Sequence, residues 1–251
     1  MAGAQAIRRA MDVVRTVGRL QRLDATLAKV AQATGLNQST AFRILRSLTE
    51  ERMLYYDEER RTYYLGVLAF ELGLATAGRS RVQQVLLPVV EEVARRTRLT
   101  TYLMARSDTE AVCLLCVEGA AVIRAKPIEL GQRLPLGIGA GSMAILSTCD
   151  DDEADSIIAA QESNYRLYPS GEEIVPLIRQ RMAQTRRNGF AMTSGSVARG
   201  VSGVGIPIQP RRGLLQLAIS VSAVIDEMDE GEARKFALIM QSALQQASFP
   251  A

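Results

Sequence analysis

Apolar residues recur three and four positions apart in the opening part of the chain, which is the spacing of an amphipathic helix. The pattern predicts a helix over residues 6–20. A second, shorter helix is predicted to begin after Thr26, a suitable N-cap, and to end at Thr34. Gly35 follows directly and can adopt the left-handed conformation that terminates a helix.

A third helix is predicted from Gln38 to about Glu51, with Asn37 as its N-cap. Its apolar residues lie on one face, and the opposite face carries mainly amide, hydroxyl and guanidinium groups. The apolar positions are Ala41, Ile44, Leu45 and Leu48, and the opposite face consists of Gln38, Ser39, Thr40, Phe42, Arg43 and Arg46.

Two short runs of β-forming residues follow at 53–56 and 62–65, separated by the polar segment 57–61. This pattern predicts a β-hairpin. Three helices, a glycine-containing turn before the third and a hairpin after it are typical of a winged helix-turn-helix. We expect residues 1–66 to form this DNA-binding domain.

The next segment, residues 66–77, has helical character and is apolar on more than one side. A helix of this kind needs partners on two faces. We therefore expect residues 67–79 to form a linker helix that also packs against a second subunit. Gly78-Arg79-Ser80 interrupts the pattern, and we expect the domain boundary there.

From residue 80 onward strands and helices are interleaved, which predicts an α+β domain with a mixed sheet and helices on its faces. A glycine-rich loop within residues 134–142 is expected to open a short helix. Further helices are expected at 81–97, 151–160, 172–188 and 229–246, and strands at 100–106, 111–117, 122–128, 203–208 and 214–222.

The composition excludes several kinds of function. The 251 residues contain no histidine, so neither a Ser-His-Asp triad nor a histidine-containing metal site can be built. Lysine occurs only at positions 29, 126 and 235, and we expect neither catalysis nor a cofactor. The sequence also lacks an apolar run of membrane-spanning length and a secretory leader, which predicts a cytoplasmic protein with no membrane partner.

The small net charge of +3 is unevenly distributed. Residues 1–78 hold 11 Arg and Lys against 8 Asp and Glu, whereas residues 79–251 hold 19 of each. The excess is densest between Arg8 and Arg46, with 8 basic residues against 2 acidic ones. This region is a candidate surface for a polyanion, although a solvated helical face would show the same charges.

Two further patterns resemble metal sites but have plainer interpretations. Cys113 and Cys116 lie on a predicted strand, where residues three apart should point to opposite faces. We therefore expect two buried thiols rather than a redox pair or half of a zinc site. The acidic run Asp150–Glu153 precedes an apolar-periodic helix, so we interpret it as a helix N-terminus rather than a metal cluster.

The sequence resembles the IclR (isocitrate lyase regulator) family of bacterial transcriptional regulators over nearly its whole length. The most specific match is A-T-G-L-N-Q-S-T-A-F-R-I-L at residues 33–45, which covers the predicted turn and third helix. The resemblance implies an N-terminal DNA-binding domain, a linker helix, and a GAF-like effector-binding and oligomerisation domain, here residues 80–251. It also implies a homodimer, or a dimer of dimers, bound at a promoter. Further similar segments are 64–66, 134–136, 187–191 and 218–222.

In a winged helix the third helix enters the major groove, so its polar face meets the bases. Arg43 is expected to contact guanine O6 and N7, and Gln38 to contact adenine. Ser39 and Thr40 suit phosphate contacts, and Phe42 suits a thymine methyl, although ordinary solvation is the alternative for each. The candidate DNA-binding set is Gln38, Ser39, Thr40, Phe42, Arg43 and Arg46, with Arg60 and Arg61 of the hairpin meeting the backbone or minor groove.

The glycine-rich loop presents backbone N–H groups before a helix, which favours an anion, and it lacks the nucleotide-binding signatures. Ser220 and Ser222 alternate with apolar residues, so both hydroxyls should face one side of a strand. The resemblance implies effector contacts at these two serines and at Ala140 and Gly141. A tight turn with hydroxyls bonded inside the sheet is the alternative. We expect a small organic acid to bind Leu136, Gly139, Ala140, Gly141, Ser142, Ser202, Gly203, Ser220 and Ser222.

These features predict a sequence-specific DNA-binding transcription regulator that binds a palindromic operator and is controlled by a small-molecule effector. One alternative is a metabolite-binding module whose N-terminal domain mediates protein contacts rather than DNA binding. A second alternative is a redox sensor that uses Cys113 and Cys116.

Overall fold

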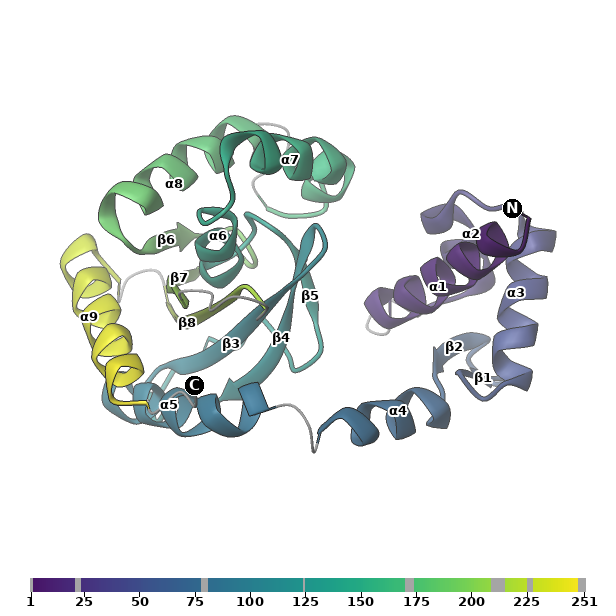
Figure 1. The fold of residues 1–251 in the computed structure, drawn as a ribbon, viewed down its shortest axis with the longest axis horizontal. Coiled ribbons are helices and arrows are strands. Elements are labelled where there is room, and N and C mark those ends of the chain that lie inside the picture. The colour runs from purple at the N-terminus through teal and green to yellow at the C-terminus, as the bar shows by residue number, and fades with distance from the viewer. Residues whose placement is uncertain are drawn as a thin grey trace. The chain divides into compact units, whose positions relative to one another are not determined.

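The computed structural model describes residues 2–20, 24–77, 81–123, 125–169, 174–208, 215–224 and 228–247. The chain divides into two compact units, residues 1–81 and 82–251, and Figure 1 shows the elements of each. Several expectations fall partly or wholly outside the described residues: the end of the linker helix and the boundary at 78–80, position 124 of a predicted strand, the helix start at 172–173 and position 214 of another strand.

The N-terminal unit begins with three helices. The second and third begin and end at or within one residue of the predicted positions, whereas the first begins at Ala2, four residues before the predicted start. The side chain of Thr26 caps α2 by accepting a hydrogen bond from the N–H of Lys29, and Gly35 ends that helix with φ +65°. The side chain of Asn37 caps α3 by accepting from the N–H of Thr40. The described elements of this unit are α1 (Ala2–Leu20), α2 (Leu27–Thr34), α3 (Gln38–Glu50), β1 (Leu54–Asp57), β2 (Thr62–Leu65) and α4 (Val67–Ala77) (Figure 1).

One small hydrophobic core holds α1, α2, α3 and the hairpin together. Val17, Val30 and Leu45 contribute one fully buried side chain from each helix, and Leu54 of β1 packs with them. Strands β1 and β2 are antiparallel. Because Leu45 lies on the inner face of α3, the opposite face of that helix is available to other molecules.

The C-terminal unit has a sheet with helices on both faces (Figure 1). In the described residues the strand order is β5-β4-β3-β8-β7-β6. Every neighbouring pair in that order is antiparallel. The described elements are α5 (Arg81–Thr97), β3 (Thr100–Ser107), β4 (Glu110–Val117), β5 (Arg133–Pro135), α6 (Ala140–Leu146), α7 (Asp151–Tyr165), α8 (Ile174–Asn188), β6 (Ala191–Ser194), β7 (Val201–Ile208), β8 (Leu217–Val224) and α9 (Glu230–Gln246).

A hydrophobic core lies on each face of this sheet. Helices α6, α7 and α8 bury Met143, Ile157 and Ile178 on one face. Helices α5 and α9 bury Val90 and Met240 on the other face. Helix α6 contacts β3, β7 and β8, so the glycine-rich loop that precedes it lies against the central strands.

The strand arrangement differs from the sequence-based expectation in three respects. The sheet is antiparallel rather than mixed, because β3–β4 and β6–β7 are hairpins and β8 returns between β3 and β7. Residues 122–128 do not form a strand in the described part of the chain. The carbonyl of Ala125 instead accepts a hydrogen bond from the Ser222 hydroxyl, so this segment is held by a side chain. The edge strands β5 and β6 are too short, and β5 too rich in proline, for the pattern to predict them.

Strand β4 contains a β-bulge. Leu115 pairs with Leu103, whereas Cys113 pairs with the very next residue of β3, Met104. Leu114 is therefore an extra residue that has no partner across the ladder.

The bulge changes which side chains share a face. Cys113 belongs to the core under α6, and Cys116 packs against the same core. The expectation that these thiols point to opposite faces is therefore wrong, because the extra residue shifts the alternation between them. The carbonyl of Leu114 accepts a hydrogen bond from the side chain of Gln83 in α5 at 3.0 Å, which stabilises the bulge.

Candidate functional site

Helix α3 presents a polar face to solvent. Its N-terminus is well ordered, because the side-chain oxygen of Asn37 accepts from the Ser39 hydroxyl at 2.9 Å and from the Thr40 N–H at 2.8 Å. Thr40 is half-buried, whereas Phe42 is 48% exposed despite its aromatic ring. The exposed members of the predicted set on α3 are Gln38, Ser39, Phe42, Arg43 and Arg46.

The guanidinium of Arg46 is engaged on its own helix. Its Nε donates to Oε1 of Glu50 at 2.8 Å, and both side chains are more than half exposed. An exposed pair at this spacing contributes only about 0.3–0.5 kcal/mol, so a DNA phosphate or base could displace it. Glu50 was absent from the predicted set, although its position four residues after Arg46 signals the pair.

The hairpin supplies two further basic side chains. Arg60 and Arg61 lie in the turn between β1 and β2 and are exposed, as predicted. The turn is tight, because the N–H of Arg60 donates to a carboxylate oxygen of Asp57 at 3.0 Å and Arg61 has φ +53°.

A groove joins α2, α3 and the hairpin. Its aromatic part is formed by Tyr56 and Tyr63, whose ring centroids are 4.6 Å apart across the two strands. Sequence reasoning missed these rings, although two tyrosines in each strand are a visible signal. The groove is lined by Thr26, Leu27, Ala28, Gln38, Phe42, Arg46, Thr49, Glu50, Tyr56, Arg61 and Tyr63, of which Gln38, Phe42, Arg46 and Arg61 were predicted to bind DNA.

The second unit contains a cavity between the glycine-rich loop and the sheet. It brings together every predicted effector-binding residue except Leu136, which is fully buried in the core. The carbonyl of Leu136 accepts from the Tyr165 hydroxyl at 2.7 Å, so this residue anchors the loop. The lining residues are Tyr102, Met104, Pro127, Ile128, Leu134, Gly139, Ala140, Gly141, Ser142, Thr193, Ser196, Val197, Val201, Ser202, Gly203, Ser220, Val221 and Ser222.

Two glycines allow the loop to approach the sheet. A Cβ at Gly141 would lie 2.7 Å from the side chain of Met104 and 2.9 Å from the hydroxyl of Ser220. A Cβ at Gly205 would lie 2.7 Å from the backbone of Ala140. Side chains at these positions would push the loop away from the strands and change the cavity.

The hydroxyl groups of the cavity differ in how they are bonded. The Ser142 hydroxyl donates to the carbonyl of Gly139 at 3.1 Å, and the Ser222 hydroxyl donates to the carbonyl of Ala125. The Ser220 hydroxyl has no hydrogen-bond partner among the described residues. Of these three serines, Ser220 is therefore the one whose hydroxyl is available to a ligand.

The cavity is small and uncharged. Its free volume is about 30 Å³, which is the space of about one water molecule. None of the described lining residues carries a charge. The N–H of Gly139 donates to the Ser196 hydroxyl at 3.3 Å, so the expected row of free backbone donors is already partly used.

Burial raises the pKa values of the two thiols of β4. Burial, with a smaller contribution from the neighbouring Cys116, raises the pKa of Cys113 to about 12. Burial also raises the pKa of Cys116. Because the thiolate is the species that reacts and binds metals, both groups are poor redox and metal-binding centres at neutral pH. This finding argues against the redox sensor.

The acidic run has a structural role. The side chain of Asp150 caps α7 by accepting from the N–H of Glu153 at 2.8 Å. Glu153 then pairs with Arg106 at 2.8 Å, and Asp151 pairs with Arg186 at 2.6 Å. The described residues contain no cluster of three or more metal-ligating side chains. They also contain no helix that is long and apolar enough to cross a membrane.

Two family profiles match the chain. Residues 6–58 match the IclR helix-turn-helix domain. Residues 74–249 match the profile described as "Bacterial transcriptional regulator IclR C-terminal". The chain belongs to the IclR family. It is thus a DNA-binding transcription regulator with an effector-binding C-terminal domain, and the family consists of regulators rather than enzymes.

Curated relatives support the same assignment. This IclR regulator is 24% identical to the HTH-type transcriptional regulator XynR of Escherichia coli over 95% of its own length and 94% of the relative. It is 26% identical to the regulator KipR of Bacillus subtilis, over 81% of its own length and 80% of the relative. These likenesses extend over both units of the chain.

Solved structures share the fold. An IclR family regulator from Brucella abortus has a TM-score of 0.77 at 18% identity, covering 97% of this chain and 93% of that one. An IclR homologue from Microbacterium hydrocarbonoxydans, solved in complex with 4-hydroxybenzoate, has a TM-score of 0.67 at 21% identity. The latter match covers 96% of this chain and all of the relative.

Proposed function

We propose that this IclR regulator binds a palindromic operator as a homodimer, or as a dimer of dimers, and that a small organic acid controls the binding. In this proposal residues 1–66 bind DNA and residues 67–79 link the domains. Residues 80–251 form a GAF-like domain that binds the effector and mediates oligomerisation. The exposed guanidinium of Arg43 on the polar face of α3 carries the proposal.

The DNA contacts follow from the position of each side chain. Arg43 has the length and the paired donors to contact guanine O6 and N7, and Gln38 has the amide that matches adenine. Phe42 projects an exposed ring from the same face and suits a thymine methyl. Ser39, Thr40 and Arg46 on α3, with Arg60 and Arg61 on the hairpin, are assigned to phosphates or the minor groove.

Helix α4 supports the homodimer. Val67, Phe70, Leu72 and Leu74 are each between 46% and 65% exposed. An apolar surface of this density on a short helix is typical of a protein interface. A second copy of α4 would cover it and would place two recognition helices on the two halves of a palindrome.

The effector site is proposed at the cavity beside α6. Its walls are mostly apolar, and hydroxyls of Ser142, Ser220 and Ser222 converge on it, which suits a small molecule with one or two polar groups. The Microbacterium relative was solved with 4-hydroxybenzoate, a small aromatic acid, and a compound of this class fits the same combination of apolar and hydroxyl groups. Binding changes operator affinity only if the two dimer geometries bind the effector differently.

The test measures binding of the wild type and Arg43→Ala to the intergenic DNA beside the gene, at two salt concentrations. Specific binding should fall about tenfold to a hundredfold in Arg43→Ala. Weak binding to unrelated DNA should persist and decrease steeply with salt. Arg15→Ala is the matched control, because Arg15 is an exposed arginine of α1 that pairs with Asp12 and should leave specificity unchanged.

Two results would contradict the proposal. One is equal affinity of the wild type for operator and unrelated DNA, which would leave only a basic surface. The other is unchanged operator binding and assembly state when a bound organic acid is saturating. The first result would contradict specific binding to an operator. The second would contradict control by an effector and leave operator binding standing.

A further inference from the structure

Arg181 of α8 has a guanidinium that the packing of its unit does not satisfy. Its Nη1 is buried and has no hydrogen-bond partner among the described residues. Its Nη2 donates to the carbonyl of Ser194 at 3.4 Å, which is long for an N–H···O hydrogen bond. Burial lowers the pKa of Arg181, and no described carboxylate lies close enough to oppose that effect.

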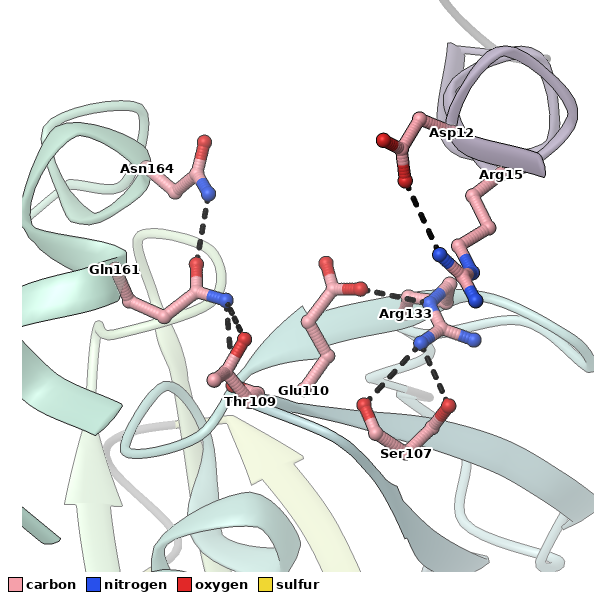
Figure 2. Close-up of polar contacts among 8 residues, drawn as sticks. All are labelled: Asp12, Arg15, Ser107, Thr109, Glu110, Arg133, Gln161 and Asn164. Atoms are coloured by element: carbon pink, nitrogen blue, oxygen red, sulfur yellow. Dashed lines mark hydrogen bonds and ion pairs between the residues drawn. The ribbon is translucent and has the colours of Figure 1, made fainter. Parts of the chain in front are cut away.

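Two other arginines of the described residues are half-buried, and both are paired. Arg133 donates to Glu110 at 2.8 Å and also to the hydroxyl of Ser107, as Figure 2 shows. Arg106 pairs with Glu153 at 2.8 Å. A buried charge without such a partner is costly, so a residue that keeps one suggests a ligand that pairs with it.

The same close-up shows a second group of polar side chains of this unit that are hydrogen-bonded to one another. Gln161 donates to Thr109 and accepts from Asn164 through the two ends of one amide (Figure 2). Among the described residues of the C-terminal unit, two buried side-chain atoms lack a hydrogen-bond partner, the Thr100 hydroxyl and Nη1 of Arg181, and of these only Arg181 carries a charge. Its unpaired donor marks a place where an external acceptor would lower the free energy.

Arg181 lies next to the wall of the effector cavity. Its acceptor Ser194 directly follows Thr193, which lines the cavity. The hydroxyl of Ser194 is also hydrogen-bonded to that of Ser202, another lining residue, at 2.8 Å. A small rearrangement of this strand end would therefore connect the guanidinium with the cavity.

The adjoining wall of the cavity is a loop with a glycine at each end. Residues 195–200 have glycine at both ends, with φ +65° at Gly195 and φ +78° at Gly200, conformations that glycine adopts without strain. Val197 between them packs against the loop so closely that a Cβ at Gly139 would lie 2.9 Å from it. Because the cavity has room for about one water, an organic effector needs this wall to shift.

We propose that Arg181 is the anion-pairing residue of the effector site. When residues 195–200 move aside, its guanidinium pairs with the carboxylate of a small organic acid whose apolar body lies in the cavity. This inference rests on the proposed function and specifies the charge of the effector. The Ser220 hydroxyl, which has no partner among the described residues, is placed to bind a second polar group of the ligand.

The same features favour a monocarboxylate over a phosphate. The described lining residues are uncharged, so a single guanidinium compensates a single negative charge. A dianion would keep one charge uncompensated in an apolar site, at a large cost in free energy. A neutral amide of the same shape would leave Nη1 without an anionic acceptor.

The experiment compares acids with their amides on the full-length protein. The probes are acetate, isobutyrate, benzoate and 4-hydroxybenzoate, each with its amide, at one concentration and ionic strength. At least one acid should raise the Tm of the wild type clearly more than its amide and bind about tenfold more tightly. This preference should disappear in Arg181→Gln and persist in Arg179→Gln, because Arg179 is an exposed neighbour that pairs with Asp155.

Three outcomes would overturn the assignment. These are equal binding of each acid and its amide by the wild type, an acid preference that survives in Arg181→Gln, and no stabilisation by any of the acids. If amides alone bind and release the operator, effector control stands while the role of Arg181 fails. Specific operator binding is tested separately with the Arg43→Ala variant. A failure of that test would not decide whether Arg181 pairs with an acid.

A stability measurement separates an anion-pairing role from a structural one. Without ligand, Arg181→Met should raise the Tm, because it removes an uncompensated buried charge. Arg133→Met should lower the Tm, because it breaks the 2.8 Å ion pair between Arg133 and the buried carboxylate of Glu110. A fall in Tm of similar size for both variants would show that Arg181 holds the fold together and would contradict the proposal.

Discussion

The two candidate sites of this IclR regulator differ in the solvent exposure of their side chains. Arg43 and Phe42 project from the outer face of one helix, and their removal would leave no gap in a core. Ser142 and Ser220 are almost completely buried between a loop and a sheet. Changes at the DNA surface should therefore alter DNA binding with little effect on stability, whereas changes at the cavity should alter both effector binding and stability.

The largest expected effect on the cavity comes from Gly141→Ala. The added Cβ would lie 2.7 Å from Met104 and 2.9 Å from the Ser220 hydroxyl, so the loop or the strand must shift. Overpacking of this kind costs about 1–3 kcal/mol, and it fills the space that an effector needs. Thermal unfolding and operator binding, with and without effector, should show a lower Tm and a lost response with operator affinity retained. An unchanged response would remove the effector site from this cavity.

Two buried serines of the cavity allow a direct comparison of a structural hydroxyl with a ligand-binding one. Ser142→Ala removes a hydroxyl that is bonded to the loop, so it should cost about 0.5–1.5 kcal/mol of unfolding free energy. Ser220→Ala removes a hydroxyl without a described partner, so it should cost less stability and weaken effector binding about tenfold. Chemical denaturation and calorimetric titration measure the two effects. The reverse pattern would assign ligand contact to Ser142 instead.

The smallest effect is expected at the DNA surface, from Glu50→Gln. The change releases Arg46 from its ion pair and removes a negative charge from the groove. Operator affinity should rise about twofold to fivefold at low salt, while stability changes by only a few tenths of a kcal/mol. Glu51→Gln is a control, because Glu51 is an exposed neighbour that does not line the groove. Weaker binding by Glu50→Gln would mean that Glu50 itself accepts from a base.

Much of the DNA-binding unit could be predicted because its signals are local. The caps at Thr26 and Asn37 and the left-handed Gly35 are decided within four residues of each position, and the structure has all three. The polar face of α3 follows in the same way from one helical period. By contrast, Thr40 is less exposed than Ser39 and Phe42, and this difference depends on how the whole unit packs.

The effector unit was less predictable because its decisive contacts are non-local. The segment at 122–128 has the composition of a strand, but the hydroxyl of Ser222, far along the chain, bonds to Ala125 within it. Leu136 belongs to the predicted loop, yet its side chain is fully buried in the core and its carbonyl accepts a hydrogen bond from the hydroxyl of the distant Tyr165. The unpaired guanidinium of Arg181 has no sequence signal at all, because it depends on which carboxylates the fold brings near.

The bulge in β4 has a consequence for chain length. Leu114 and Leu115 both pack on the side of the sheet that faces α5 and α9, while Cys113 and Cys116 pack on the other. Deleting Leu114 would therefore restore strict alternation, and every remaining side chain of the strand would keep its side. Gln83 would lose its acceptor, but the pairing with β3 would become continuous. This strand can thus lose one residue without moving any of its remaining side chains to the opposite side of the sheet.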